Sequence, residues 1–570
     1  MKIIEKQLET ILAGTIRKVR PDAPTGKLFF TKTNDEQFGD QQTNFAMAAS
    51  KELKANPKQL AGEIVEALAS DPSLTKVDIA GPGFINLTLS ERFIADEVTK
   101  IGREEYDFSF LDRQGTVVID YSSPNIAKPM HIGHLRSTVL GDSLKRIYRW
   151  LGYTVVGDNH LGDWGTQFGK LIVAYRRWLD RDAYQKSAIE ELERIYVLFG
   201  QAAEADPSLE EEARAELKKL QEGDPENRRL WQEFITLSLA EYNRIYDRMG
   251  VKFDTYHGES FFHDRMPAML ELLIEKGLAK ESEGALVVFF DESEKLHPCI
   301  VRKQDGAFLY ATSDLACLQF KRETYTLNRA VYVTDERQQP HFKQIFRIAR
   351  MLGWNEQLDH VWFGIMRFGD EKFSSRAGNV IKLDELFTEA VRRARLVIEE
   401  KNPELPAEEK AAVAEMVGLG AVKYADLSQN RISAVSFEWD KALSFDGNTA
   451  PYLQYTHARI RSIARKAEET GRPADPDAQI TITTPAERRL AVQLLGFPTA
   501  VLKAAEGYKP NLIAEYLFEL GQRFNTFYNS NPVLKEGDAV MQSRLALCLR
   551  TADVMKEGLN LLGIAAPERM

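Results

Sequence analysis

The sequence predicts an α/β protein built on a doubly wound parallel sheet, with an α+β module before it and an all-helical region after it. Three observations support this. The stretch 117–151 reads as a buried strand, a polar loop and an amphipathic helix, in that order. Strand and helix patterns alternate from there to about residue 384. Only helical patterns fill the chain from about residue 385 onward.

The composition is that of a large globular protein. With 570 residues, 44% of them hydrophobic, the chain is too long for one core and predicts three or four domains. No apolar run approaches the roughly 20 residues of a membrane span, and we expect no signal peptide. Three scattered cysteines form no disulfide framework, which favours a reducing cytoplasm. The net charge of −10 does not favour nucleic-acid binding, although phosphate contact needs only a local basic face.

Residues 1–110 form a separate block in which helices precede strands. A helical stripe begins at Ile4, and a second helix is expected at 57–69. Strand patterns follow at 76–80 and 84–89. This order predicts a compact α+β module.

The loop at 122–133 is the first candidate site. It follows the strand at 117–121 and precedes the helix, so a ligand would lie where the strand's carboxyl end meets the helix N-terminus. His131 and His134 lie three residues apart and point the same way on a helical turn, and Gly133 between them lets a ligand approach the backbone. Two histidines satisfied at a helix start are an equally good interpretation of these residues alone. The absence of HExxH, CxxC and GxGxxG patterns disfavours a zinc pair and a dinucleotide site.

The next segments complete the predicted sheet. A strand at 153–156 leads into the Gly-rich loop 157–165, where Trp164 is either functional or a core residue. Residues 170–280 read almost entirely as helix and predict an insertion that splits the α/β fold. The remaining elements expected before residue 384 are strands at 285–290, 331–335 and 361–366, a hairpin joining 299–302 to 307–310, and helices beginning near 310, 341 and 382.

One helix of the C-terminal region carries clustered basic residues. The segment 457–466 reads HARIRSIARK and follows Tyr452 and Tyr455. Cations beside aromatic rings suit RNA, because the cations hold phosphates and the rings stack on unpaired bases. A solvated basic helix without a ligand is the alternative interpretation.

Two segments resemble the signatures of a known family. Residues 122–137, SSPNIAKPMHIGHLRS, resemble the first signature of class I aminoacyl-tRNA synthetases in the form carried by arginyl-tRNA synthetases. A degraded form of the KMSKS-type second signature stands at 371–379, EKFSSRAGN. The second lysine of that pattern is Ser375 here, with Arg376 beside it. The resemblance implies that Lys128 replaces this lysine at the phosphates.

The resemblance implies a domain organisation for most of the chain. Residues 111–384 would form a Rossmann-like class I catalytic domain, with the helical insertion at about 170–280. Residues 1–110 would contact tRNA, 385–448 would form a helical linker at the tRNA stem, and 449–570 would form an all-helical anticodon-binding domain.

The implied activity is that of an arginine–tRNA ligase. L-Arginine attacks ATP to give arginyl-adenylate and pyrophosphate, and the arginyl group then passes to the terminal adenosine of tRNA. This chemistry needs no protein nucleophile, because positioning and charge stabilisation supply the catalysis. The resemblance further implies ATP and Mg²⁺ as cofactors, a cytoplasmic monomer and no membrane partner.

The residues implied on the ATP side come from both signatures. His131 and His134 are expected to stabilise negative charge at the reacting phosphate, and Lys128 to grip the phosphates. The full catalytic set is Lys128, His131, His134, Lys372 and Arg376, and Gly133, Ser374 and Ser375 complete the ATP site.

Arginine selection is expected to use carboxylates, because a guanidinium offers five fixed donors and pairs bidentately. Asp314 is the first choice, with Tyr310 one helical turn before it and Gln338 nearby. No metal ligand is expected. The remaining expected contacts are Ser123 and Asn125 for the α-amino and carboxylate groups, Asp120 and Glu259 for negative potential, and Trp164 beside the pocket. Family members often carry Glu where this chain has Asp120, and Glu259 could equally belong to a structural ion pair.

Five residues are expected at tRNA. Phe84 and Asn86 match the positions where the family's N-terminal module meets the tRNA elbow, although Phe84 could equally be core. In the C-terminal region the expected contacts are Tyr452, Tyr455 and Arg459.

Three alternatives remain at this point. Another class I specificity would keep the ATP residues and change the pocket. A synthetase-like RNA-binding protein without catalysis would explain the eroded second signature. A nucleotidyltransferase acting on a small molecule would leave the terminal regions unexplained. The sequence does not decide whether amino-acid activation needs tRNA.

Overall fold

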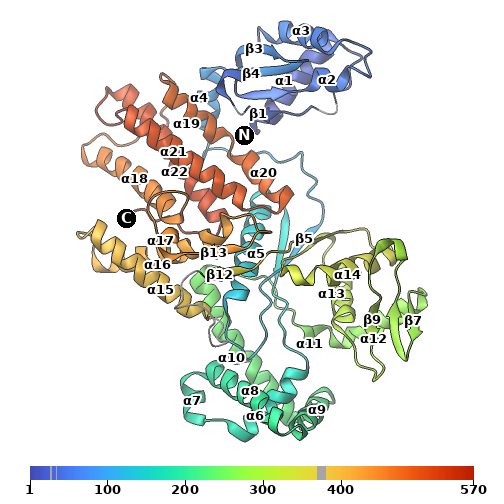
Figure 1. Cartoon of the computed structure of the whole chain (residues 1–570). Helices are drawn as coiled ribbons and strands as arrows, with labels where there is room; N and C mark the ends of the chain where they lie inside the picture. The colour runs from blue at the N-terminus through green and yellow to red at the C-terminus, as the bar shows by residue number, and fades with distance from the viewer. Residues whose placement is uncertain (26–27, 34, 369–380) are drawn as a thin grey trace.

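Four parallel strands in the order β11-β10-β5-β6 form the central sheet (Figure 1). The computed structural model describes residues 1–25, 28–33, 35–368 and 381–570. The strand bounds are Thr116–Asp120 for β5, Thr154–Asp158 for β6, Leu327–Tyr332 for β10 and Gln357–His360 for β11. The strands predicted at 117–121 and 153–156 are therefore confirmed, and β10 begins four residues earlier than predicted.

Helix α5 (Ile132–Trp150) joins β5 to β6. It stops just before Gly152, whose φ of +84° suits glycine at a helix end. The chain after β5 passes to β6 on one side, while β10 pairs with β5 on the other. The crevice at the carboxyl ends of β5 and β10 is thus the switch point at which open parallel sheets bind ligands.

The predicted helical insertion is confirmed, and its part up to residue 249 forms the lower lobe of Figure 1. Tyr242 of its longest helix packs against the loop that follows β5. The helices are α6 (Thr166–Trp178), α7 (Arg181–Lys186), α8 (Ala188–Ala205), α9 (Ser208–Gln221), α10 (Pro225–Met249), α11 (Glu259–Phe262) and α12 (Met266–Glu275).

A separate antiparallel sheet follows the insertion. It consists of β7 (Ala279–Ser282), β8 (Ala285–Val288) and β9 (Cys299–Arg302). The prediction that 285–290 belongs to the parallel sheet was therefore wrong. The predicted hairpin with 307–310 reduces to one bridge between Arg302 and Phe308, because helix α13 (Tyr310–Thr324) already begins at Tyr310. Helix α14 spans Gln339–Met351.

The strand predicted at 361–366 was also wrong. Val361 and Phe363 are buried in alternation, and their N–H groups donate to the carbonyls of Tyr332 and Thr334, but this part of the chain forms an isolated bridge to Asp335 and no strand. The strand at this point is β12 (Met366–Phe368), and it pairs in parallel with β13 (Val435–Phe437). The chain that leads to the second signature therefore leaves the central sheet.

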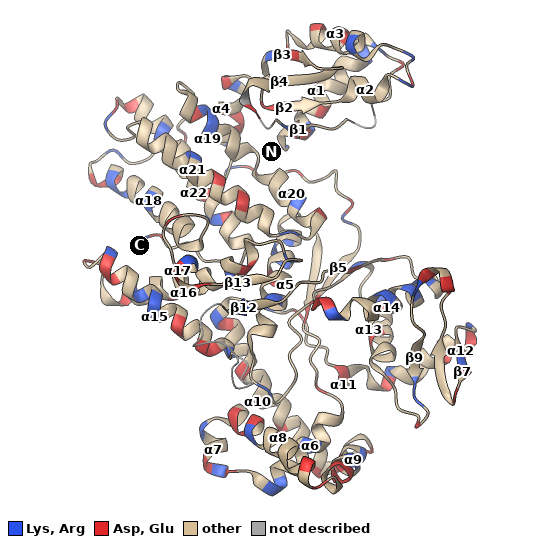
Figure 2. Cartoon of the chain, in the orientation of Figure 1, with Lys and Arg blue, Asp and Glu red and all other residues tan. Residues whose placement is uncertain are grey.

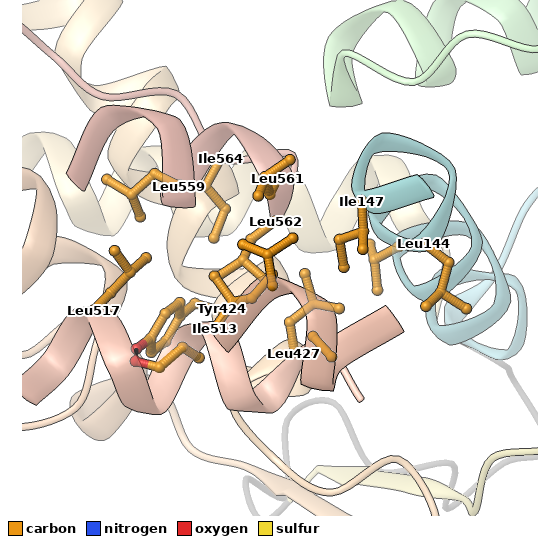
Figure 3. Packing of buried hydrophobic residues seen from close by; sticks show 14 of the residues in the cluster. Leu144, Ile147, Tyr424, Leu427, Ile513, Leu517, Leu559, Leu561, Leu562 and Ile564 are labelled. Atoms are coloured by element: carbon orange, nitrogen blue, oxygen red, sulfur yellow. Dashed lines mark hydrogen bonds between the residues drawn. The ribbon is translucent and has the colours of Figure 1, made fainter. Parts of the chain in front are cut away.

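The C-terminal region packs directly on α5. Leu144 and Ile147 of α5 belong to the same apolar cluster as Leu559 and Leu562 (Figure 3). The all-helical region predicted from about residue 385 onward is confirmed apart from β13. Its helices are α15 (Leu383–Lys401), α16 (Ala407–Leu427), α17 (Trp439–Ala442), α18 (Ala450–Glu469), α19 (Pro485–Leu495), α20 (Phe497–Gly507), α21 (Asn511–Ser530) and α22 (Asp538–Leu561).

The N-terminal module is the predicted α+β unit. Its antiparallel sheet has the order β1-β2-β4-β3. Arg488 of α19 fixes it to the helical region through two hydrogen bonds to the Asp40 carboxylate, at 3.0 and 2.7 Å. The elements are α1 (Ile4–Val19), β1 (Thr31–Lys32), β2 (Gln41–Thr43), α2 (Phe45–Ala49), α3 (Pro57–Leu68), β3 (Leu74–Ala80), β4 (Phe84–Leu89) and α4 (Glu91–Lys100).

Charges are interleaved over the lobes (Figure 2). Many are local helical ion pairs, such as Arg194 with Glu191 at 2.7 Å. Over the described ranges, no helix has the length and apolar character needed to cross a membrane.

Candidate active site at the switch point

The loop after β5 has a strained backbone that its neighbours hold in place. Ser122, Ser123 and Ala127 all have positive φ, at 74°, 50° and 61°. Such conformations cost about 1–3 kcal/mol each and persist where the surroundings fix them. Tyr242 supplies part of that fixation, since its hydroxyl donates to the carbonyls of Asn125 and Lys128 at 2.6 and 2.8 Å. The loop is therefore preorganised before any ligand arrives.

Helix α5 fixes the other side of this loop. The Ser122 N–H donates to the Ser137 hydroxyl at 2.8 Å, and that hydroxyl donates to the carbonyl of Val333 at 2.6 Å. Thr138 donates to the Ser122 hydroxyl at 2.8 Å. These bonds tie together the ends of β5 and β10, on either side of the switch point.

His131 and His134 start helix α5 as a capping pair. The Gly133 N–H donates to His131 Nδ1 at 3.0 Å, and the His131 N–H donates to His134 Nδ1 at 3.1 Å. Because both Nδ1 atoms accept, each neutral ring carries its proton on Nε2. Burial lowers the pKa of His134 to about 3. Burial, together with the charge of Lys128, also lowers the pKa of His131. At neutral pH the helix start thus presents two Nε2–H donors.

Gly133 is required by the capping geometry. A Cβ at this position would lie 2.8 Å from Cε1 and 2.9 Å from Nδ1 of the His131 ring. A side chain here would therefore displace the imidazole that caps the helix.

Lys128 adds a cation to the same end of the helix. Its Nζ lies 4.9 Å from the ring centre of Tyr196, a helix α8 residue. The ammonium, the two imidazole donors and the positive end of α5 together form a site suited to phosphate. Four residues expected to share this role, Lys372, Ser374, Ser375 and Arg376, lie outside the described residues.

A group of acidic side chains lies near the carboxyl ends of the central strands. Tyr310 and Asp314 share helix α13, as predicted, and Glu259 begins helix α11. Burial and the nearby charges of Asp314 and Asp163 raise the pKa of Glu259 to about 7, against the opposing effect of His160. Burial and the charges of Glu259 and Asp314 also raise the pKa of Tyr310. These groups are close enough to attract one cation jointly.

Asp314 has a partner that the sequence did not suggest. Its Oδ2 lies 2.5 Å from Nε2 of His341, on helix α14. Both side chains remain about one quarter exposed. Gln338 is exposed, and Tyr310 is 70% exposed, so both are accessible to a ligand.

Asp120 does not contribute the free negative charge expected of it. The ammonium of Lys321 lies 2.8 Å from Asp120 Oδ2 and 3.6 Å from Asp158 Oδ2. Lys321 is only 1% exposed. Burial opposes its charge, but Asp120 and neighbouring groups outweigh burial and raise the pKa of Lys321. The acid is therefore neutralised within the protein and has a structural role.

The other expected arginine contacts divide into accessible and buried ones. Asn125 is exposed. The Ser123 hydroxyl donates a hydrogen bond to Asp120 Oδ1 at 3.3 Å. Trp164 is 9% exposed and packs edge-on against Trp231, with ring centres 5.7 Å apart. Trp164 is thus a core residue.

The two residues expected to touch tRNA in the N-terminal module differ in accessibility. Phe84 is half-buried at the start of β4. Asn86 is 4% exposed, and its Oδ1 accepts from Gln42 at 2.6 Å. The Asn86 side chain therefore stabilises the sheet and is too buried to contact a base.

Two of the three C-terminal candidates, Tyr455 and Arg459, line a cleft of about 990 Å³ beside α18. Tyr455 is 43% exposed, and the guanidinium carbon of Arg459 lies 4.5 Å from the ring centre of Tyr528. Tyr452 is half-buried, with its hydroxyl accepting from Asn525 at 2.9 Å. Tyr455 and Arg459 face the cleft, together with Arg465, Lys466, Lys535 and Arg569.

The structure adds two residues that sequence reasoning missed at the pocket. Lys321 lies seven positions after Asp314 in the same helix, so the helical period places both on one face. His341 follows Gln338 by three positions in the next helix, a spacing that also places residues on one face. Helical spacing could therefore have found both residues, but not their partners.

Three family models together match most of the chain. They are described as "tRNA synthetases class I (R), catalytic domain" at 98–439, "DALR anticodon binding domain" at 453–570 and "Arginyl tRNA synthetase N terminal domain" at 6–89.

Similar proteins point the same way. The chain is 54% identical to an arginine–tRNA ligase of Fusobacterium nucleatum over all of both chains. It is 42% identical to one of Streptococcus equi over 99% of this chain and 100% of that one. The solved arginyl-tRNA synthetase of Thermus thermophilus has a TM-score of 0.83 at 27% identity, with full coverage of both chains. That of Plasmodium falciparum has a TM-score of 0.82, also at 27% identity and full coverage. This chain therefore belongs to the arginyl-tRNA synthetase family, within class I of the aminoacyl-tRNA synthetases.

Proposed function

We propose that this protein activates L-arginine with ATP and transfers the arginyl group to the terminal adenosine of its cognate tRNA. The main support for the proposal is that two sites of opposite charge character lie at one switch point. A group of neutral and cationic donors suits the phosphates of ATP, and an acidic pocket suits a guanidinium.

On the ATP side, the two imidazoles act as donors in fixed orientation. Their Nδ1 atoms are held by backbone N–H groups, so each Nε2–H points away from the helix start. Negative charge that develops on the α-phosphate as the arginine carboxylate attacks would meet these donors and Lys128. Preorganised donors of this kind cost no reorganisation when the reaction occurs.

On the arginine side, the acids select the guanidinium. Asp314 pairs with the planar fork of donors, and Glu259 adds a second carboxylate, with Tyr310 and Gln338 beside them. The exposed Asn125 amide and Ser123 hold the α-amino and carboxylate end. Lysine has no planar fork and would leave part of this acidic surface unpaired. Such a mismatch supports discrimination of about 10⁴ or more without editing.

We also propose a separate role for each region of the chain. Residues 1–110, with Phe84, contact tRNA; 111–384 carry out the chemistry, with the insertion at about 170–280. Residues 385–448 contact the tRNA stem, and 449–570, with Tyr452, Tyr455 and Arg459, bind the anticodon side. We further propose that the protein works as a monomer in the cytoplasm.

Mg²⁺ is proposed to enter with ATP. Among the described residues, one group has ligand atoms close enough for a metal, namely Asp120, His160 and Cys317, with atoms within 4.8 Å of one another. The Lys321 ammonium already lies 2.8 Å from Asp120 and supplies the positive charge there. These residues therefore do not fit a resident metal, and the ATP phosphates would carry the Mg²⁺ themselves.

The first experiment is ATP–pyrophosphate exchange with each of the twenty amino acids, with and without total tRNA. Exchange with arginine alone is expected, and the two series show whether tRNA is required. Exchange with another amino acid would overturn the pocket assignment, and no exchange in any mixture would point to RNA binding without catalysis.

Arginine affinity is expected to depend on pH through Glu259. Its pKa is about 7 in the free protein, and bound guanidinium favours the ionised form. The dissociation constant of arginine should therefore rise about tenfold from pH 8 to pH 6. Equilibrium dialysis at each pH measures this, and Glu259→Gln should remove the pH dependence while ATP affinity stays unchanged. A pH profile that persists in Glu259→Gln would assign the effect to another group.

Tyr455→Ala is expected to raise the KM for tRNA about tenfold, since one base stacked on an aromatic ring contributes about 1–3 kcal/mol. Aminoacylation at varied tRNA concentration measures this effect. Phe289→Ala is the matched control, because Phe289 is 46% exposed on the separate antiparallel lobe. Equal KM values in both variants would remove Tyr455 from the tRNA interface.

A further inference from the structure

We propose that Arg136 is a positioning residue that fixes helix α5, which carries the first signature, to the chain that leads into β12 and to the C-terminal helical region. The inference rests on the proposed function, because its effect appears in the activation step. Arg136 lies in α5, two residues after His134, and is 1% exposed. It does not reach the phosphate site itself.

The first contact of Arg136 is a buried ion pair with helix α16. Its Nε and Nη2 both lie 2.9 Å from Oδ1 of Asp426, whose side chain has no exposed surface. The two residues are 290 positions apart in the sequence. The other carboxylate oxygen of Asp426, Oδ2, has no hydrogen-bond partner within the part of the chain that the structure describes.

The remaining donors of Arg136 bind backbone carbonyls on two further segments. Nη1 donates to Gly364 at 2.5 Å and to Ser433 at 3.2 Å. Nη2 donates to Arg431 at 3.3 Å. The guanidinium plane also lies near the Phe363 ring, with its carbon 5.5 Å from the ring centre. One buried guanidinium therefore holds three separate parts of the chain.

These two segments lead directly into the paired strands β12 and β13. The Gly364 N–H donates to Arg431 at 3.0 Å, and the Val435 N–H donates to Ile365 at 2.9 Å. A Cβ at Gly364 would lie 3.0 Å from the Ser433 carbonyl oxygen, so the backbones approach closely. The chain entering the second signature is thus attached to the segment after α16, and Arg136 joins that pair to α5.

The energetic consequence follows from burial. Loss of the guanidinium would leave the Asp426 carboxylate and the carbonyls of Gly364 and Ser433 without this donor in a buried site, while the Arg431 carbonyl would keep the Gly364 N–H. The surrounding segments would move to satisfy these groups, and α5 would shift relative to β12. His131 and His134 begin α5, so their Nε2–H donors would move relative to the other phosphate-binding groups. A misplacement of about 1 Å is enough to cost about 10²-fold in rate.

Two conservative substitutions test this. Arg136→Lys keeps a cation but cannot reach all four acceptors. Asp426→Asn keeps the volume and one oxygen but removes the charge. The matched control is the pair Arg544–Glu487, which is buried (side chains 9% and 2% exposed), has a 2.8 Å contact and lies within the helical region. Arg544→Lys and Glu487→Gln perturb a similar ion pair that touches neither signature.

The measurements on the full chain are kcat for arginine-dependent pyrophosphate exchange, dissociation constants for arginine and ATP, and Tm. Arg136→Lys and Asp426→Asn are expected to lower kcat about 10–100-fold with both dissociation constants within about twofold. The double variant should be no slower than the slower single variant, because the two residues act as one unit. The control variants should lower Tm comparably and keep kcat within about twofold.

Two results would overturn the proposal. One is a kcat loss no greater than in the controls at a comparable Tm. The other is a parallel loss of kcat and of both affinities, which would indicate a general loss of structure. The proposed function is tested separately by the unmodified protein, since absence of arginine-dependent exchange there refutes the function and not the positioning role.

Discussion

Asp314→Ala is expected to abolish arginine use while leaving ATP affinity unchanged. The carboxylate lies in the acidic pocket with Glu259 and Tyr310 and is the acid best placed to pair with a guanidinium. Removal of one member of a largely buried, hydrogen-bonded charge pair costs about 2–5 kcal/mol. Arginine affinity should therefore fall about 10²–10³-fold, as measured by equilibrium dialysis with arginine and, separately, with ATP.

Two companion variants make this result specific. Asp314→Asn removes the charge at nearly constant volume and should lower arginine affinity as much as Asp314→Ala does. Glu323→Ala removes another acid from the same helix, one whose side chain is 53% exposed, and should leave arginine affinity unchanged. Unaltered arginine affinity in Asp314→Ala would refute the pocket assignment.

Replacement of His134 should separate its capping role from its catalytic role. In His134→Asn the side-chain oxygen replaces Nδ1 as acceptor for the His131 N–H, but no donor replaces Nε2–H. In His134→Gln the amide nitrogen replaces the donor, and the cap is lost. Loss of one preorganised donor costs about 3–4 kcal/mol in the transition state. His134→Asn should therefore lower the exchange kcat by about 10²–10³-fold with little change in Tm.

His134→Gln is expected to show the reverse balance. Its Tm should fall, because loss of a helix cap costs about 1 kcal/mol, while kcat stays well above that of the asparagine variant. Equal kcat values for the two variants would show that the ring serves the helix and not the phosphate. Stopped-time exchange assays and thermal unfolding of the same preparations provide both numbers.

The fold was predictable from sequence where local pattern decides it. Helix α5 follows from its apolar spacing and from Gly152, and β5 from its β-branched run. The segment 361–366 was misleading because Val361 and Phe363 alternate in burial and hydrogen-bond to the end of β10, yet the regular ladder with β10 already ends at His360. The true partner of this part of the chain is β13, and nothing local at 366–368 indicates a partner about 70 residues away.

The site was predictable in its residue types and less so in its pairing. His131, Gly133 and His134 lie together at the start of α5 with Lys128 just before them, and Tyr310 and Asp314 share helix α13 near Glu259. Asp120 could not be judged, because its neutralising partner Lys321 is 201 positions away. Asn86 has the right residue type for base recognition, but its place in the middle of a sheet depends on Gln42 across from it.

The packing of α5 has a consequence for biosynthesis. Leu144 and Ile147 of this helix belong to the same apolar cluster as Leu559 and Leu562, and the Ser143 hydroxyl donates to the Leu561 carbonyl, 418 positions later. At about 5–20 residues per second, a ribosome needs roughly 20–80 s to add that length. For this interval the native cover of an apolar face of the helix that begins with His131 and His134 is incomplete. The nascent chain is therefore expected to require a chaperone or a transient local cover until the last helix emerges, even though its central sheet is complete some 200 residues earlier.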